Sequence, residues 1–388
     1  MHKVKNLGQV YTPDNIVDDM LRLRKNNGTA LEPSSGNGAF SSKIDDIISI
    51  EIDGTNKLHN VIMDFFDYST DNKFNTIIGN PPYVAYKHIL ADSLIKIKSL
   101  DHLNEFDNRT NLYIYFIRKC LEHLSENGEM IFITPRNFIN ATSAIKLNNL
   151  LYKLGTITDW HEYGDQPAFK GYSPTVAIWR FEKNNFSRVT KTKIGDKKFN
   201  LNNGQISFTS HDYDIKFSDL FFVKVGAVSG CDKIFAHKNG DTDFVCSYTK
   251  TNGLLKRMYY DKKDEYINAH KDVLINRKIK KFTENNWWHW GRGLYKSNQE
   301  RIYVNCKTID KKPFLKHECK NYDGSVLAIF PKIDIDIHQI VDLLNNVDWN
   351  DLGFLIGERL CFSQKALENS CLIGENWLHL IKEHISSN

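Results

Sequence analysis

The tetrapeptide Asn80-Pro81-Pro82-Tyr83 combines residue types that could bind and activate an amine. The Asn80 amide oxygen and the Pro81 carbonyl are hydrogen-bond acceptors, and the two prolines fix the chain and remove N–H groups. Two acceptors that face one point suit an exocyclic NH2 group, and Tyr83 offers a flat face to the ring that carries it. The alternative interpretation is a rigid Pro-Pro turn with a packed tyrosine.

The segment Glu32–Gly38 could hold a nucleotide-like ligand. Its sequence, Glu-Pro-Ser-Ser-Gly-Asn-Gly, is an acid followed by a glycine-rich turn, which lets the backbone approach a ligand closely. Glu51 lies about 20 residues further on, where a carboxylate can accept both hydroxyls of a ribose. The segment lacks the GxGxxG spacing of a pyrophosphate site, which argues against NAD. For Glu51 alone, the alternative is a surface acid at a strand end.

Short apolar runs alternate with amphipathic stretches in the first half of the chain, and these elements would position both motifs. The apolar runs predict buried strands at residues 29–31, 47–50, 60–63, 76–79 and 129–133. Residues 111–125 carry an apolar helical stripe, and Asn127-Gly128 predicts the C-cap of that helix. Alternating strands and helices indicate an α/β fold with a parallel sheet.

The sheet should end in a hairpin and be followed by a second domain. Residues 156–161 and 175–181 have no helix-length segment between them, so they predict an antiparallel edge hairpin with residues 164–174 as its loop. Asn, Lys and Ser then accumulate at 182–203. We therefore predict a catalytic domain at 1–185, a boundary region at 186–214 and a mixed α/β domain at 215–388.

The net charge of +4 is unevenly distributed. Residues 1–185 carry 20 basic and 22 acidic side chains, whereas the rest of the chain carries 31 and 25. The densest basic stretch, 271–320, has 13 basic against 5 acidic side chains and is rich in Trp and Tyr. This pattern favours a surface that follows phosphates, as in nucleic-acid binding. A solvated lysine-rich face over an aromatic core is an equally good interpretation.

Composition excludes several classes of protein. With 388 residues, 41% of them hydrophobic, the chain can bury one large or two ordinary cores. We find no run long and apolar enough for a membrane span, and the first residues lack the apolar core of a signal peptide, so export is not expected. The seven cysteines form no CxxC pair, which favours a reducing cytoplasm. Cys306, His317 and Cys319 lack zinc-site spacing, and we predict no metal.

The two motifs resemble those of amino-methyltransferases. Asn-Pro-Pro-Tyr is a signature of DNA adenine-N6 methyltransferases and also of protein-glutamine methyltransferases. Glu32–Phe40 is similar to their S-adenosylmethionine loop, and Gly8–Pro13 resembles the segment that caps the methionine end of this cofactor. The order of cap, cofactor loop, catalytic loop and C-terminal specificity domain resembles the gamma class, which includes the TaqI methyltransferase. The resemblance covers about residues 6–182, and 223–235 looks like the opening of such specificity domains.

The resemblance implies a Rossmann-like S-adenosylmethionine-dependent fold and a set of site residues. The implied cofactor contacts are Tyr11, Thr12, Pro13, Glu32, Pro33, Ser34, Gly36, Gly38, Phe40, Glu51, Ile52, Asp64, Phe65, Asn80 and Pro82. The implied catalytic residues are Asn80, Pro81, Pro82 and Tyr83, with Phe169 stacking on a flipped adenine. Asn111-Leu112-Tyr113 with Phe116 resembles the helix start beyond the catalytic loop.

The resemblance also implies double-stranded DNA as the partner. Candidate DNA contacts are Lys87, Arg109, Arg277, Lys280, Lys281, Trp288, Arg292 and Lys296, with Lys278 and Arg301 as further basic side chains. The target adenine would be flipped out of the duplex and methylated on N6. We expect a cytoplasmic monomer of prokaryotic or phage origin, either an orphan or one whose cognate restriction endonuclease is encoded separately.

Two other classes of function compete with this interpretation. The first is methylation of a different substrate, RNA adenine or protein glutamine; the cofactor cap, the basic C-terminal domain and Phe169 argue against the protein substrate. The second is a non-catalytic DNA-binding specificity subunit, against which stand the intact Asn80–Tyr83 and Glu32–Phe40 motifs.

Overall fold

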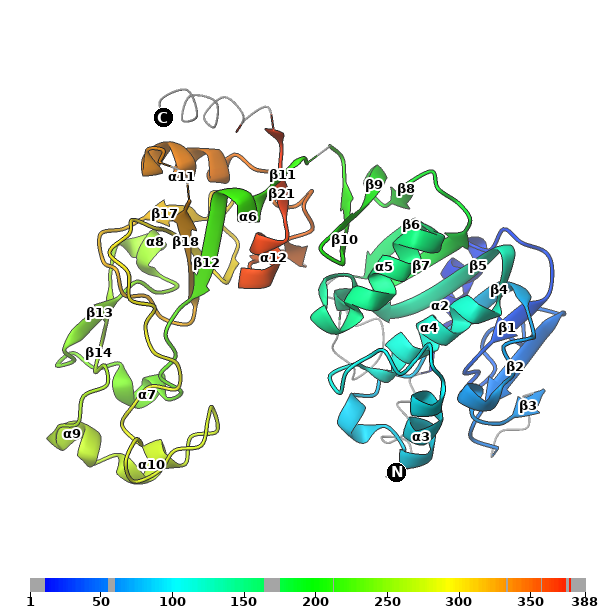
Figure 1. Cartoon of the computed structure of the whole chain (residues 1–388), viewed down its shortest axis with the longest axis horizontal. Coiled ribbons are helices and arrows are strands. Elements are labelled where there is room, and N and C mark those ends of the chain that lie inside the picture. Colours follow the sequence, from blue (N-terminus) through cyan, green and yellow to red (C-terminus); the bar gives the residue numbers. More distant parts are fainter. Residues whose placement is uncertain are drawn as a thin grey trace. The chain divides into compact units, whose positions relative to one another are not determined.

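The chain forms two compact units, Met1–Ser210 and His211–Asn388. The computed structural model (Figure 1) describes residues 11–54, 60–163, 175–211, 213–332, 334–356, 358–374 and 377. None of the helices in these ranges is long and apolar enough to cross a membrane.

The first unit is built on one mixed sheet, whose ten described strands run in the order β10-β9-β8-β6-β7-β5-β4-β1-β2-β3. β1 to β5 are parallel neighbours, as the strand–helix alternation predicted. The strands are β1 (Ala30–Glu32), β2 (Ile47–Glu51), β3 (Val61–Ile62), β4 (Phe74–Gly79), β5 (Leu124–Pro135), β6 (Gly155–Tyr163), β7 (Val176–Lys183), β8 (Val189–Thr192), β9 (Gly195–Asn202) and β10 (Gln205–Thr209).

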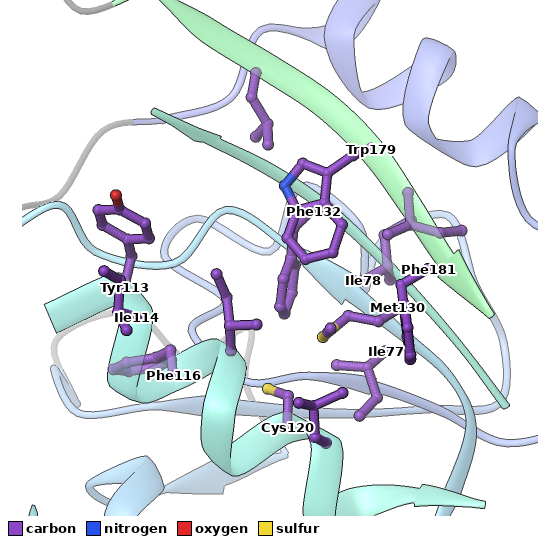
Figure 2. Packing of buried hydrophobic residues seen from close by; sticks show 14 of the residues in the cluster. Ile77, Ile78, Tyr113, Ile114, Phe116, Cys120, Met130, Phe132, Trp179 and Phe181 are labelled. Atoms are coloured by element: carbon purple, nitrogen blue, oxygen red, sulfur yellow. The ribbon is translucent and has the colours of Figure 1, made fainter. Parts of the chain in front are cut away.

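Helices cover this sheet, and α4 is the one that matters most for the site. Asn111 caps its N-terminus by accepting from the Tyr113 amide, and its apolar face packs on the strands. Figure 2 shows Phe116 and Cys120 of α4 in the same packed cluster as Ile77 of β4 and Met130 of β5. The helices of this unit are α2 (Asp14–Arg22), α3 (Ala91–Ser99), α4 (Leu112–His123), α5 (Ile145–Leu154) and the 3-10 turns η1 (Phe65–Asp67), η2 (Tyr86–His88), η3 (Arg136–Asn140) and η4 (Thr142–Ala144).

The hairpin of β6 and β7 is antiparallel, but it does not lie at the edge of the sheet. β6 also pairs in parallel with β8, and β9 and β10 extend the sheet further. Phe199 and Ile206 on these added strands are 1% exposed, so the strands belong to the core. The predicted boundary region at 186–214 is therefore wrong for 189–209, because the first unit extends to Ser210. The polar composition of this segment reflects solvated outer faces rather than a linker.

Asn127-Gly128 does not cap α4 as predicted. The helix already ends at His123, and the chain enters β5 at Leu124. Asn127 adopts a positive φ of 60°, and the pairing of β4 with β5 shifts register between Phe74 and Thr76. The Asn-Gly pair thus forms an irregularity inside a strand, because both residues tolerate left-handed backbone.

The second unit is a mixed α/β domain, as predicted, with a four-stranded sheet in the order β12-β18-β15-β17 at its centre. Its strands are β11 (Ile215–Lys216), β12 (Phe221–Val225), β13 (Thr242–Phe244), β14 (Lys256–Met258), β15 (Ile302–Asn305), β16 (Lys307–Thr308), β17 (Phe314–Lys316), β18 (Val326–Pro331), β19 (Leu355–Ile356), β20 (Arg359–Cys361) and β21 (Cys371–Leu372). Its helices are α6 (Phe217–Leu220), α7 (Asp232–Phe235), α8 (Thr249–Asn252), α9 (Glu265–Asn268), α10 (Lys271–Ile275), α11 (Ile337–Asn345) and α12 (Gln364–Glu368).

Candidate active site

The carboxyl ends of the parallel strands share one pocket, because neighbouring parallel strands end at the same edge of a sheet. Glu51 ends β2, Asp64 follows β3, and Asn80 follows β4. The pocket encloses about 830 Å³ of space, open solvent at its mouth included. Its lining residues are Tyr11, Pro33, Ser34, Gly36, Glu51, Ile52, Met63, Asp64, Phe65, Phe66, Asn80, Pro81, Pro82, Val84, Ile89, Leu90, Ser93, Leu112 and Phe116.

The glycine-rich turn after β1 is tied to Glu51. The Gly36 amide donates to Oε2 of Glu51 at 2.7 Å, and the amides of Ile52 and Asp53 donate to Oε1 at 3.1 and 3.0 Å. Gly36 has a φ of +54°, a backbone region that favours glycine. A carboxylate has about four acceptor positions, so three are occupied. A ribose hydroxyl would use the remaining position or share the one that the Gly36 amide occupies.

Glu32 lies beneath the turn rather than in the pocket wall. Its side chain is buried, and Oε2 accepts from the Ser41 amide at 2.9 Å. Burial raises the pKa of Glu32 to about 8, although the bond from Ser41 opposes the shift. The turn is further closed by the Gly38 amide, which donates to the Ser35 carbonyl at 2.7 Å. Glu32, Gly38 and Phe40 therefore support the turn in this structure and do not line the pocket.

The far end of the pocket is aromatic and acidic. Asp64 caps η1 by accepting from the Phe66 amide at 3.0 Å, and its other oxygen accepts from the Ser93 hydroxyl at 2.6 Å. Phe65 stacks on Phe116 of α4 with ring centroids 5.1 Å apart. An apolar slot beside a buried carboxylate suits a heterocyclic base that bears an amino group.

Asn80 is held by two segments that precede it in the chain. Its side-chain nitrogen donates to the Thr12 hydroxyl at 3.2 Å, and its main-chain carbonyl accepts from the Ser34 hydroxyl at 3.2 Å. The first bond orients the amide so that its nitrogen faces Thr12. Thr12 itself is buried, and Pro13 precedes α2.

Tyr83 packs into the core next to the pocket. It is 9% exposed, its hydroxyl donates to the Ile133 carbonyl at 2.7 Å, and its ring meets Tyr113 edge-on at 5.9 Å. The Leu112 amide donates to the Val84 carbonyl at 2.8 Å, which joins the tetrapeptide to the start of α4. Stacking of Tyr83 on a base stays a prediction. Phe169 and Gly8–Val10 lie outside the described residues.

Sequence reasoning missed the residues that close the pocket between β4 and α4. Ile89, Leu90 and Ser93 approach from η2 and α3, and Met63 and Phe66 flank Asp64. The segment that carries α3 has no motif, and its amphipathic pattern is weak. For this part of the pocket, the resemblance had singled out the helix start at Asn111–Phe116.

The basic segment of the second unit separates into buried and exposed side chains. Residues 276–301, all described, form neither helix nor strand. Arg277 is buried, and its guanidinium donates to the carbonyls of Leu274, Ser229, Trp287 and His289. Burial lowers its pKa to about 10. Arg277, which was predicted to contact DNA, is instead an interior residue whose hydrogen bonds hold the segment together. Arg301, 3% exposed, is interior as well.

The other candidate DNA contacts are accessible to different extents. Lys280 is exposed, although its Nζ donates to the Trp290 carbonyl at 2.7 Å, and Arg292 is exposed while its Nε donates to the Gly226 carbonyl at 2.8 Å. Trp288 is half-buried with Lys263 above its ring. Further exposed side chains are Lys87, Arg109, Lys278, Lys281 and Lys296, of which Arg109 pairs with Asp107.

This sheet, with its strand-end pocket and antiparallel hairpin, is the Rossmann-like fold of S-adenosylmethionine-dependent methyltransferases. Residues 20–169 match the Eco57I restriction-modification methylase family.

Individual relatives agree with the family match. The chain is 28% identical to the type II methyltransferase M.HindII of Haemophilus influenzae over 94% of this chain and 89% of that protein. It is 33% identical to M.HincII of the same species over 50% of this chain and 40% of the relative. The solved structure of the type IIL restriction-modification enzyme MmeI in complex with DNA has the same fold, with a TM-score of 0.61 at 12% identity. That match covers 95% of this chain and 64% of MmeI.

Proposed function

We propose that the protein is a site-specific DNA methyltransferase that transfers a methyl group from S-adenosylmethionine to the N6 amine of adenine. The observation that carries the proposal is the placement of Asn80, Pro81 and Pro82 in the same pocket as Gly36, Glu51 and Asp64. The amine-binding motif and the nucleotide-binding motif thus share one cavity. The relatives named above are type II methyltransferases, which supports DNA as the substrate.

The residues present fit S-adenosylmethionine. Glu51 retains acceptor capacity toward a ribose, and Asp64 with Phe65 and Phe116 forms an acidic aromatic end that suits adenine. When bound, this cofactor supplies an electrophilic methyl group on a sulfonium. Tyr11, 57% exposed at the mouth of the pocket, and Ser34 next to Asn80 would enclose the methionine end.

Methyl transfer to the amine makes few chemical demands on the protein. The amine nitrogen forms a bond to the methyl carbon as the bond from sulfur to that carbon breaks, and the methylated amine then releases a proton to solvent water. The Asn80 oxygen and the Pro81 carbonyl would accept hydrogen bonds from the two N6 hydrogens, which favours the pyramidal nitrogen of the transition state. Tyr83 and Phe169 would stack on the extruded base and offset the few kcal/mol that flipping costs.

The substrate class is tested by offering three acceptors to the purified protein. Labelled S-adenosylmethionine is incubated with unmethylated genomic DNA, with total RNA and with a protein extract. We expect label in DNA alone. Label in RNA or in protein glutamine, with none in DNA, would contradict the proposal, and binding of DNA without any transfer would support a specificity subunit instead.

We further propose that the protein acts as a cytoplasmic monomer in a prokaryotic or phage-encoded restriction-modification system, with any cognate endonuclease on a separate chain. Gel filtration with bound DNA and a search for a neighbouring nuclease gene would test these two points.

A further inference from the structure

Lys119 is a lysine buried in the core of the first unit. It lies on α4 three residues after Phe116, and it is 1% exposed. Lysine is almost never fully buried without a charged partner, because removing an ammonium from water is costly. Among the described residues, no carboxylate lies within ion-pair distance of its Nζ.

The partner that Lys119 does have belongs to the pocket. Its Nζ donates to the main-chain carbonyl of Phe65 and lies 4.8 Å from the centroid of the Phe65 ring. The Phe66 ring is 5.9 Å away. Phe65, Phe66 and the preceding Asp64 all line the pocket, so Lys119 supports the acidic aromatic end from behind.

The Phe65 carbonyl does not depend on Lys119 to be satisfied. It also accepts from the Tyr68 amide at 3.1 Å, the bond that closes η1. A lysine that merely filled space here could be replaced by methionine, which has a similar shape and no charge to desolvate. The presence of an ammonium at this position therefore calls for a role beyond packing.

The charges around Lys119 lie on the pocket side. Asp64, which caps η1, and Asp67 at its end attract the Lys119 ammonium, and Lys96 of α3 bridges the same two carboxylates, 3.6 Å from Asp64. The Cys120 thiol neighbours it on α4. Burial lowers the pKa of Lys119 to about 8, which is consistent with an ammonium kept in place against a desolvation cost.

We propose that Lys119 is a positioning residue for the nucleoside end of the cofactor pocket. Through the Phe65 carbonyl it fixes the turn that presents Asp64 and Phe65 to an adenine ring, and its charge attracts the Asp64 carboxylate. It contacts no ligand itself. This inference rests on the proposed function, because it takes a nucleoside-bearing cofactor as the ligand.

The test separates ligand binding from stability. S-adenosylmethionine and 5′-methylthioadenosine, which carries the nucleoside but no amino-acid end, are titrated calorimetrically into wild type, Lys119→Met and Lys119→Gln. We expect Lys119→Met to bind both ligands at least tenfold more weakly, with an unfolding midpoint that is unchanged or higher. Lys119→Gln, which keeps a donor, should recover part of the affinity. With saturating cofactor, kcat of Lys119→Met should stay within about threefold of wild type.

The matched control is Arg118→Met on the same helix. Arg118 pairs with Glu105 and Glu122, and it does not line the pocket, so its loss should leave both affinities unchanged. Wild-type affinity of both ligands for Lys119→Met would overturn the inference, as would weaker binding of S-adenosylmethionine with unchanged binding of methylthioadenosine. If Lys119→Met fails to fold, wild-type affinity in Lys119→Gln combined with lower stability would overturn it too. Absence of cofactor binding in wild type would instead contradict the proposed function.

Discussion

The side-chain amide of Asn80 donates a 3.2 Å hydrogen bond to the hydroxyl of Thr12, a residue 68 positions earlier. Thr12 is fixed in turn, because the carbonyl of the next residue, Pro13, accepts from the amides of Ile16 and Val17 at the start of α2. The orientation of the central amide is therefore set by the segment that the resemblance assigns to the cofactor cap. Thr12 and Asn80 thus belong to one hydrogen-bonded arrangement, although they lie far apart in the sequence.

This relationship predicts the effect of removing the Thr12 hydroxyl. Thr12→Val keeps the shape of the side chain and loses the acceptor, which removes one hydrogen bond that orients the Asn80 amide. We expect kcat to fall about tenfold, the value of roughly one hydrogen bond. Thr12→Ser restores the hydroxyl and should restore the rate. Steady-state kinetics on both variants would check this, and equal rates for Thr12→Val and wild type would rule the positioning role out.

Glu51 should matter for cofactor binding rather than for chemistry. Glu51→Gln keeps the size of the side chain but replaces one acceptor oxygen by an NH2 group, which opposes the Gly36, Ile52 or Asp53 amide. We expect the Kd for S-adenosylmethionine to rise roughly 10- to 100-fold, as for the loss of one or two charge-assisted hydrogen bonds. Calorimetry measures it directly. An unchanged Kd would show that Glu51 supports the turn without contacting the ligand.

Glu32 predicts a pH dependence of stability. Burial raises the pKa of Glu32 in the native state to about 8, above the ordinary value of 4.5. Between these two pH values the native protein keeps the Glu32 carboxyl protonated, whereas the unfolded chain has lost that proton. The contribution of Glu32 is fully present below pH 4.5 and is lost as the pH rises toward 8. Wild type should therefore lose stability relative to Glu32→Gln across this window. Urea unfolding of both proteins at several pH values would show a constant difference if Glu32 ionised normally.

The second unit offers two classes of basic side chain with opposite expected behaviour. Arg277→Met leaves four carbonyls without their donor and should destabilise this unit by about 3 kcal/mol. The pair Lys281→Ala and Lys296→Ala removes exposed charges and should leave stability within about 0.5 kcal/mol.

The exposed lysines, which should matter little for stability, should matter for DNA binding. Loss of Lys281 and Lys296 should weaken DNA binding and lower the salt dependence of log K by about 1.8, if each neutralises one phosphate. A fluorescence-anisotropy titration at several salt concentrations measures this slope. An unchanged slope would place the DNA surface elsewhere on the protein.

Much of the first unit followed from local patterns in the sequence. The strands β1, β2, β4 and β5 contain short apolar runs, and residues 111–125, with the apolar stripe through Phe116 and Leu121, marked α4. Glu51 and Asn80 were singled out by the residue types and spacing of their motifs, and Asp64 by the resemblance; the parallel strands bring all three to one edge. These signals depend on a few neighbouring residues, which is why they could be recognised in a single chain.

What the sequence did not show depends on contacts between distant residues. β8 to β10 look like a polar linker, because only the inward side chains such as Phe199 and Ile206 carry their packing. Arg277 and Lys280 are equally basic in the sequence, yet one is interior because distant carbonyls converge on it. Lys119 likewise looks like an ordinary helix residue in the sequence, because its contact with the Phe65 carbonyl joins residues 54 positions apart.

The identity of the methylated nucleoside distinguishes the proposed function from its alternatives. Unmethylated DNA is treated with wild type or Asn80→Ala and S-adenosylmethionine, digested to nucleosides and analysed by mass spectrometry. We predict N6-methyladenine with wild type, and at least a hundredfold less with Asn80→Ala at equal cofactor affinity. N4-methylcytosine, or N6-methyladenine formed equally well by the variant, would contradict it.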